Sequence, residues 1–472
     1  MGTTVIAWVE WFNQFLWGYP ALILILGTGL YLSLRTSFLP IRKLGYSLKL
    51  VFRKLRQSPE TDGVSPFQAV CTALAATVGT GNIAGVAGAI ALGGPGALFW
   101  MWVAAFLGMV VKYAEIVLAV HYRVQNQDGS FSGGPMYYIS RGMGRNWRWL
   151  GTLYCMFGVV AAFGVGNSTQ ISTAVVSMNE ALPLFGLSPS FAGNLCMGLV
   201  LGALVALVVL GGAKRIGAVA ELLIPIMSVS YLLFGLGAIA VNYKAIPQAL
   251  SSVISGAFCP RAVTGGAIGS LWIAVRTGVS KGVFTNEAGM GTASMAHAGA
   301  NTKSPAEQGL YGIFEVFVDT ILICTVTALV ILTSGVSISY GTSAGAELTC
   351  FAFQSVYGSW ITLFLALSMI LFAFATILGW GLYGAQCVRY LFGERWVKPF
   401  GIVHALITVL GSILSPALVW SLAEIFNGLM ALPNLLAVLT LSPEILRLSQ
   451  AYMSTRNVLL FNSAQKSHST TA

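Results

Sequence analysis

Charged side chains are scarce in this sequence. Asp, Glu, Lys and Arg make up 8% of its 472 residues, whereas a soluble domain usually carries about 25%. Hydrophobic residues reach 56%, and 54 positions are glycine. This balance excludes a soluble enzyme, a disordered chain and a nucleic-acid-binding module. It is typical of an all-α polytopic membrane protein, in which glycine lets helices pack closely.

The signatures of common catalytic sites are also missing. The chain has four His and contains no His-Glu-x-x-His motif, no Cys/His cluster and no Gly-Lys dipeptide, so neither a zinc site nor a P-loop is present. We therefore predict that it is neither an enzyme nor an ATP-driven pump, and that it needs no cofactor. A channel is a further alternative function, but channels usually have a selectivity-filter loop and fewer membrane spans per chain.

The seven cysteines are scattered singly and form no Cys-x-x-Cys pair, so we interpret them as small buried hydrophobic residues. They stand at positions 71, 155, 196, 259, 324, 350 and 387. No basic region precedes the first apolar stretch. We therefore expect no cleaved signal peptide.

Long runs without any charged residue predict membrane spans, because a span needs about 20 largely apolar residues. We predict one N-terminal span at about 17–34. Ten more, numbered 1 to 10, are predicted at about 66–92, 96–121, 148–180, 190–211, 216–241, 262–299, 309–334, 354–389, 399–417 and 419–442. The total is eleven.

The distribution of Lys and Arg predicts the orientation, since basic residues accumulate in cytoplasmic loops. With segment 35–57 inside, 20 of the 25 basic residues fall in inside loops or the C-terminal tail, and only Lys244 and Arg261 fall outside. The N-terminus is then outside and the C-terminus cytoplasmic. The protein would be a multi-pass protein of the plasma membrane, specifically a bacterial inner membrane.

These spans divide the chain into four regions. We predict an N-terminal interfacial helix (5–16), the extra span and a basic cytoplasmic loop in 1–62, a first five-span unit in 63–261, a second in 262–445, and a cytoplasmic tail in 446–472. Segment 245–260 is predicted to be a helix lying on the outer membrane surface, because counting it as a span would reverse the later loops.

Two spans are rich in Gly and polar residues. Both contain Asn-x-Ala-Gly, at 82–85 in span 1 and at 286–289 in span 6, five spans apart and therefore in opposite orientation. Glycine-interrupted segments at matching positions of two halves predict a transporter binding site, because a broken helix frees backbone groups that only a polar cavity can satisfy. The alternative for 79–85 is close helix packing through small residues, although Thr80 and Asn82 add polar groups that packing does not need.

Several motifs resemble the alanine/glycine:cation symporter family, the sodium:alanine symporters of the amino acid-polyamine-cation superfamily. Residues 93–102 read Gly-Gly-Pro-Gly-Ala-Leu-Phe-Trp-Met-Trp, with Gly108 six residues later, which matches the family signature completely. Segments 78–85, 284–289 and 379–381 are also similar to family motifs, and the resemblance covers about 15–445. It implies a LeuT-type fold of two inverted five-span repeats with spans 1 and 6 broken.

The same resemblance implies Na⁺-driven uptake of alanine, with glycine or serine as further substrates, by a monomer in the lipid bilayer and without nucleic acid. A H⁺-coupled carrier of a different small neutral amino acid is the alternative. No acid lies within the span 1 break. The substrate ammonium group would then be held by carbonyls and hydroxyls.

In this fold spans 1, 3, 6 and 8 surround the substrate. The substrate-binding candidates are Thr77, Gly79, Thr80, Gly81, Asn82, Gln170, Gly278, Gly282, Thr376 and Trp380; the Gly79 carbonyl and Thr376 are candidate Na⁺ ligands. Backbone NH groups of span 1 would meet the carboxylate, and Trp380 would limit the side chain to methyl size. An interhelical hydrogen bond for Gln170 and ordinary aromatic packing for Trp380 remain open.

Overall fold

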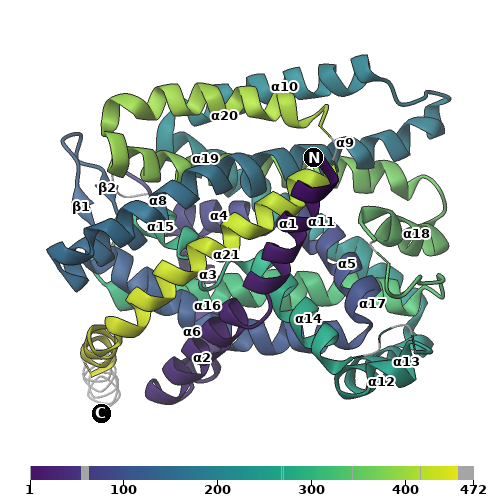
Figure 1. Ribbon diagram of the computed structural model, residues 1–472, viewed down its shortest axis with the longest axis horizontal. Helices are drawn as coiled ribbons and strands as arrows, with labels where there is room; N and C mark the ends of the chain where they lie inside the picture. The colour runs from purple at the N-terminus through teal and green to yellow at the C-terminus, as the bar shows by residue number, and fades with distance from the viewer. Residues whose placement is uncertain are drawn as a thin grey trace, which may run out of the picture.

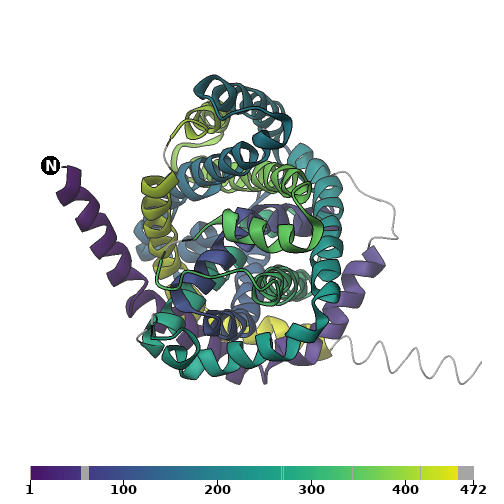
Figure 2. The same cartoon turned by 90° about the vertical axis from the view of Figure 1, so that its right-hand side faces the viewer.

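The structure, a computed structural model, describes residues 2–54, 63–266, 268, 270–342, 344–414 and 416–454. It is a bundle of helices whose chain starts with α1 (Gly2–Leu16), α2 (Pro20–Arg35) and α3 (Leu39–Lys54) (Figure 1). Asn13 of α1 donates to the Glu424 carboxylate at 2.8 Å. The end of α1 therefore packs against the bundle, while Figure 2 shows its N-terminal end leaning away.

The first predicted five-span unit folds entirely into helices, apart from one hairpin. Its helices are α4 (Pro66–Thr77), α5 (Ala84–Gly93), α6 (Gly96–His121), α7 (Pro135–Tyr138), α8 (Arg148–Phe163), α9 (Thr169–Ala181), α10 (Phe191–Val209), α11 (Gly212–Val241), α12 (Ile246–Phe258) and α13 (Pro260–Val263). Strands β1 (Val124–Gln125) and β2 (Phe131–Ser132) pair antiparallel between α6 and α7. A π-helical segment, Gly164–Ser168, joins α8 to α9.

The second unit is helical throughout. It contains α14 (Leu271–Asn286), α15 (Thr292–Ala298), α16 (Pro305–Val316), α17 (Thr325–Thr333), α18 (Ala346–Tyr357), α19 (Ile361–Phe392), α20 (Val397–Gly411) and α21 (Pro416–Thr440). The π-helical segment Phe317–Cys324 joins α16 to α17. After α21 the chain bends by 62° into a last helix, Ser442–Ser454. Residues 446–454 of the predicted tail are thus helical, and the rest of the tail lies outside the described residues.

Helix length supports fewer spans than the charge pattern predicts. Within the described residues, seven helices are long and apolar enough to cross a membrane, and two bent pairs raise the number to nine. The two predicted spans without such a helix are 6 and 9. Span 6 is split between α14 and the seven-residue α15. For span 9, α20 has only 15 residues, about 22 Å of helix against a hydrocarbon core of about 30 Å.

One predicted span boundary is wrong. Span 8 was expected from 354, but α19 begins at Ile361 because a separate helix, α18, precedes it. Gly358, with φ of 77°, ends α18 and permits the reversal. The predicted surface helix at 245–260 does form, as α12, and it packs against α6 through the Trp100 Nε1 bond to the Ala257 carbonyl at 3.0 Å.

The centre of the bundle is built around α6 and α19. α6 packs against α14 and α16, and α19 packs against α8, α9 and α4, while α10 and α20 lie side by side along one edge (Figure 1). Close backbone approaches make these contacts. A Cβ at Gly379 of α19 would come within 2.7 Å of the Ala76 Cβ on α4. The glycine is required because any side chain there would separate the two helices.

The signature segment 93–102 forms the turn from α5 to α6. A Cβ at Gly96 would lie 2.1 Å from the carbonyl carbon of Gly256 in α12, and Trp102 donates to the Thr325 hydroxyl at 2.8 Å. The segment therefore joins α6 to α12 and α17 through packing and indole hydrogen bonds.

Candidate functional site

The first helix of the site is interrupted between α4 and α5, with a bend of 57°. α4 ends at Thr77, Gly79 is extended, and the short turn Thr80–Asn82 leads into α5. The Asn82 side chain accepts the Gly79 N–H at 2.9 Å. An amide side chain therefore replaces the helical partner that this N–H loses at the break.

Gln170 and Thr376 meet this break from two other helices. The Thr80 hydroxyl and N–H both donate to Gln170 Oε1, at 2.8 and 3.3 Å. The Thr376 hydroxyl donates to the Ala75 carbonyl at 3.0 Å, and a Cβ at Gly79 would come within 2.5 Å of that hydroxyl oxygen. The structure thus brings these predicted residues of spans 1, 3 and 8 together at one buried place.

A carboxylate lies beside the same break. The Asn82 amide donates to Asp319 Oδ1 at 2.7 Å, and the Thr320 hydroxyl donates to Oδ2, also at 2.7 Å. Asp319 is fully buried. Among the described residues, no basic nitrogen lies within 4 Å of its carboxylate oxygens. Its hydrogen-bond partners, Asn82 and Thr320, are both neutral, although an isolated buried carboxylate is costly without a cation or a proton.

Asp319 corrects the inference that the first break has no acid near it. It is 237 residues away from Asn82 in the sequence and reaches the break from the π-helical segment between α16 and α17. Neighbouring polar side chains from α14 extend the cluster: Asn286 donates to the Thr320 hydroxyl at 3.0 Å, and the Thr285 hydroxyl lies 3.5 Å from it.

The second interruption separates α14 from α15 at residues 287–291. Glu287, Gly289 and Gly291 all have positive φ, of 55°, 92° and 75°. Glu287 is the unusual one, because side chains other than those of Gly, Asn and Asp rarely adopt this conformation. Its carboxylate accepts the Thr292 hydroxyl at 2.5 Å, in the first turn of α15.

Side chains from α6, α8 and α21 hold this second interruption. Lys112 of α6 donates to the Asn286 carbonyl at 2.7 Å, where α14 ends. Tyr154 donates to the Met290 carbonyl at 2.9 Å. Asn434 donates to the Gly289 carbonyl at 2.8 Å and to Glu115 at 2.5 Å. The freed backbone carbonyls therefore all meet specific donors.

Glu115 of α6 is a further buried acid at this interruption. It is fully buried, and its carboxylate accepts the Gly291 N–H at 3.1 Å as well as the Asn434 amide. A buried acceptor for a freed N–H explains why an acid is present on α6.

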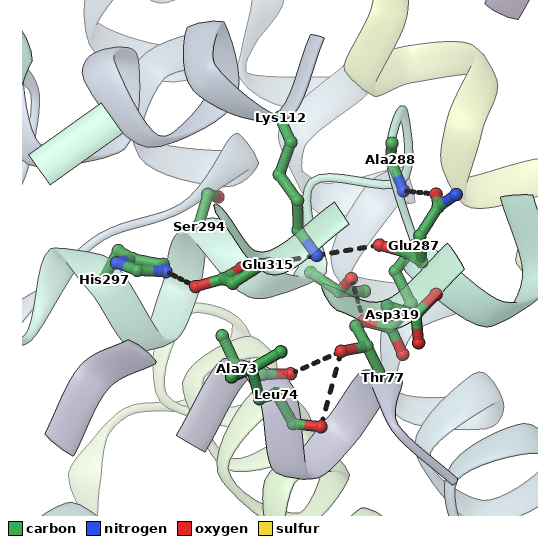
Figure 3. A network of polar contacts seen from close by, with 12 residues as sticks. Ala73, Leu74, Thr77, Lys112, Glu287, Ala288, Ser294, His297, Glu315 and Asp319 are labelled. Atoms are coloured by element: carbon green, nitrogen blue, oxygen red, sulfur yellow. Dashed lines mark hydrogen bonds and ion pairs between the residues drawn. The ribbon is translucent and has the colours of Figure 1, made fainter. Parts of the chain in front are cut away.

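Lys112 also starts a chain of buried ionisable groups (Figure 3). Its ammonium lies 3.4 Å from Glu315, whose other oxygen lies 2.5 Å from His297 Nε2. The Gln308 amide and His297 Nδ1 are 2.9 Å apart. Glu315 thus has a cation from the protein itself, which Asp319 lacks among the described residues. Lys281 likewise pairs with Glu424 at 2.5 Å, which links α14 to α21.

Of the other predicted residues, Gly278 and Gly282 lie apart from the cluster, whereas Thr77 and Gly81 lie at the first break itself. A Cβ at Gly278 would come within 2.3 Å of the Ala97 carbonyl oxygen, and Gly282 faces Met101, so both lie against α6. Gly81 faces Phe284 and Thr285 of α14. The Thr77 hydroxyl donates to the carbonyls of Ala73 and Leu74 in its own helix (Figure 3).

Trp380 is buried between three helices. A Cβ at Gly166, in the π-helical segment after α8, would come within 2.2 Å of its Cβ and Cγ. Its ring meets Tyr383 edge-on with centroids 5.7 Å apart. Thr376 and Trp380 share a face of α19, with Thr376 toward the first break and Trp380 toward the π-helical segment.

Inspection of the sequence missed Asn434 and His297 and gave no pairing for Lys112. Each is polar or ionisable within an otherwise apolar stretch, and intramembrane groups of this kind are functional candidates by default. That rule identifies the positions. It does not reveal which of them meet, because Lys112 and Asn434 contact residues more than 100 positions away, and His297 meets Glu315, 18 residues away, across a helix end and a loop.

The comparisons with known proteins match almost the whole chain. The model of the sodium:alanine symporter family matches residues 2–465. The chain belongs to the sodium:alanine symporter family. It is 41% identical over 448 residues to the sodium/alanine symporter AgcS of Methanococcus maripaludis, covering 94% of this chain and 96% of AgcS. It is 42% identical over 443 residues to an uncharacterized transporter of Haemophilus influenzae, covering 93% and 94%.

The fold of this symporter-family member is that of a LeuT-type transporter. The crystal structure of MhsT in complex with L-phenylalanine matches with a TM-score of 0.59 at 13% identity, covering 83% of this chain and 93% of MhsT. The chain is therefore a multi-pass membrane transporter and not an enzyme, and Na⁺ is the coupling ion that its family implies.

Proposed function

We propose that this symporter imports alanine, and also glycine or serine, together with Na⁺ by alternating access in the bacterial inner membrane. The observation that carries the proposal is the buried meeting of an interrupted helix with Gln170, Thr376 and Asp319. Backbone donors, hydroxyls and one carboxylate match the three charges to be carried: a substrate carboxylate, a substrate ammonium group and a sodium ion.

The substrate carboxylate is placed at the start of the turn Thr80–Asn82. There the hydroxyl and N–H of Thr80 now donate to Gln170 Oε1, and helix N-termini attract anions. The carboxylate would take over these two donors, while the Gln170 amide, which donates to the Val165 carbonyl at 3.0 Å, keeps the side chain in place. Thr77, Gly81, Gly278 and Gly282 would act by shaping and packing the surrounding helices.

Two cation positions follow from the oxygens present. One is near Thr376, where its hydroxyl meets the Ala75 carbonyl and Gly79 lies close by. The other is beside Asp319, whose carboxylate accepts hydrogen bonds from the neutral side chains of Asn82 and Thr320. A Na⁺ ion there would compensate a charge that otherwise makes the folded protein less stable. The first site supports the predicted role of Thr376, and the second adds a ligand that the sequence did not indicate.

Asp319 also supports the alternative of H⁺ coupling, since a carboxyl group can carry a proton in place of Na⁺. Uptake of labelled alanine into proteoliposomes at constant pH separates the two. We expect uptake to stop when Na⁺ is replaced by choline, and to persist with a protonophore. Uptake that continues in choline and collapses with the protonophore would overturn Na⁺ coupling.

We further propose eleven spans, with interrupted spans 1 and 6, two inverted repeats at 63–261 and 262–445, an outside N-terminus and a cytoplasmic C-terminus. The 20-to-2 distribution of basic residues between inside and outside loops supports this orientation. A reporter inserted after Gln57 should then be cytoplasmic and one at Gly186 external. The same location for both reporters would contradict the eleven-span arrangement.

A further inference from the structure

A basic cavity lies at the turn between α2 and α3, away from the transport site. Its volume is about 230 Å³, room for about seven water molecules at about 30 Å³ each. The lining residues come from the end of α2, the start of α3 and the last helix: Arg35, Thr36, Ser37, Leu39, Arg42, Lys43, Leu446, Ser449, Gln450 and Met453. Three of them are cations and none of these described residues is acidic.

The backbone turn brings the three cations together. Ser37 and Phe38 are both left-handed, with φ of 52°, which is uncommon for such residues. This conformation reverses the chain between α2 and α3 within three residues. Arg42 then reaches back, and its guanidinium donates to the Ser37 carbonyl at 3.4 Å. Arg35, the last residue of α2, therefore lines the same cavity as Arg42 and Lys43.

An exposed apolar stripe runs along α2 to this cavity. Ile23, Leu30 and Leu34 are 66%, 50% and 59% exposed, and their spacing places them on one face of the helix. From Ile23 to Leu34 the helix rises about 16 Å, close to one leaflet of a core about 30 Å thick. Phe38 and Ile41, also exposed, flank the cavity on the other side of the turn.

We propose that this cavity binds the phosphate of an anionic phospholipid of the inner leaflet. Arg35, Arg42 and Lys43 hold the phosphate, because guanidinium and ammonium groups are the usual phosphate donors. The acyl chains lie along the stripe from Leu34 to Ile23. Inorganic phosphate could bind the same cations, but it has no acyl chain to contact the exposed apolar residues of α2 next to them. The proposal is independent of the transported substrate.

Ser449 lines the cavity from the last helix and holds that helix in place. Its hydroxyl lies 2.7 Å from the Tyr113 hydroxyl and donates to the Ile445 carbonyl, so it fixes the helix Ser442–Ser454 to α6. Bound lipid would therefore join α2, α3 and that last helix at the surface that we assign to the cytoplasm.

The test measures lipid retention by the full-length protein in detergent with native mass spectrometry. The parent is compared with Arg35→Gln/Arg42→Gln/Lys43→Gln, and with a control that removes the same charge from exposed arginines of the loop before α8, Arg141→Gln/Arg145→Gln/Arg148→Gln. We expect the parent and the control to retain phosphatidylglycerol equally. The cavity variant should retain about tenfold less phosphatidylglycerol, because each basic residue near an anionic headgroup adds to the electrostatic attraction that binds it.

Competition distinguishes the source of the phosphate. Excess inorganic phosphate should not displace phosphatidylglycerol, and phosphatidylcholine should be retained equally by all three proteins. Displacement by inorganic phosphate, an equal loss of lipid in the control, or an equal dependence of phosphatidylcholine on the three cations would each overturn the proposal. If the triple variant does not elute as a folded monodisperse protein, Arg42→Gln alone should still lower retention, and unchanged retention in it also counts against the site.

Discussion

The two helix interruptions at the centre of this symporter are stabilised in opposite ways. At 287–291 the protein supplies its own cation: Lys112 binds the carbonyl that ends α14 and lies 3.4 Å from Glu315. At 78–83 the neighbouring acid, Asp319, has neutral partners only among those described. The second interruption thus has one buried acid, Glu315, paired with a lysine of the protein, while Glu115 and Glu287 there meet neutral donors. At the first interruption Asp319 has no such lysine within 4 Å among the described residues, and we propose that an exchangeable ion compensates its charge.

This difference indicates which of the two interruptions binds the transported ion. A cation covalently attached to α6 cannot exchange, so the network of Lys112, Glu315 and His297 fixes the geometry of α15. A carboxylate beside freed backbone groups, at the interruption that Gln170 also contacts, is suited to an exchangeable ion. Changes at the second interruption should therefore affect folding, and changes at the first should affect transport.

The largest effect is expected for Lys112→Met. It leaves Glu315 buried without its ammonium partner and the Asn286 carbonyl without its donor. Breaking a buried ion pair in this way costs about 3–5 kcal/mol, so thermal unfolding in detergent should occur at a clearly lower temperature. The double variant Lys112→Met/Glu315→Gln should recover much of the loss, since no carboxylate is then left unpaired. If Lys112→Met unfolded at the same temperature as the parent, the proposed structural role of the second interruption would be wrong.

Asp319→Asn should abolish transport while leaving the fold intact. A cation 4 Å from the carboxylate gains about 4 kcal/mol at an effective dielectric constant of 20, so losing the charge should lower Na⁺-driven alanine uptake by more than a hundredfold. The amide keeps the shape, and its oxygen can still accept one of the two hydrogen bonds. Uptake is measured in proteoliposomes, with unfolding temperature as the control. Normal Na⁺ dependence in this variant would exclude Asp319 as a coupling ligand.

Gln170→Ala should weaken alanine binding by about tenfold. It removes the partner of the Thr80 hydroxyl and the side chain that orders the carboxylate site, and a neutral hydrogen bond of this kind contributes about 0.5–1.5 kcal/mol, up to about a tenfold change in affinity. The matched control is Gln308→Ala, which removes a comparable amide from the His297 network at the second interruption. Its uptake KM for alanine should stay near that of the parent. Equal KM values for the two variants would contradict the assignment.

Trp380→Ala should have the smallest effect on alanine and the clearest effect on selectivity. The indole packs on Gly166, so its loss opens space beside the pocket, and water fills part of it. Alanine should bind several-fold more weakly, while leucine or methionine should compete better than in the parent. In a competition assay, leucine and methionine should inhibit alanine uptake by Trp380→Phe more than by the parent and less than by Trp380→Ala. An unchanged ranking of competitors would make Trp380 ordinary aromatic packing.

Composition and charge pattern predicted most of the fold. The helical class, the surface helix now seen as α12 and most span positions followed from apolar runs and from the placement of Lys and Arg. The separate helix α18 was missed because its sequence is as free of charge as the span that follows it, apart from Glu347 at its start. Apolar runs show that a helix forms, but not where one helix ends and the next begins.

The candidate site was predictable in part. Glycine and polar residues within apolar spans indicated Thr80, Asn82 and Thr376, and their contacts place them at one interruption. The position of Asp319 beside Asn82 could not be predicted, because that contact joins residues 237 apart. Gly278 and Gly282 also lie in a glycine-rich apolar span, yet they pack against α6. Small residues permit close helix packing as well as binding, so glycine alone does not identify a binding site.

The short helix α20 has a consequence for the membrane around the protein. At about 22 Å it is roughly 8 Å shorter than a typical hydrocarbon core, and it lies with α10 at one edge of the bundle. If α20 is the proposed span 9, the bilayer at that edge would have to thin to meet it, at a cost of a fraction of a kcal/mol for each ångström of mismatch. We therefore expect transport to depend on acyl-chain length and the protein to gather where the bilayer is thinnest.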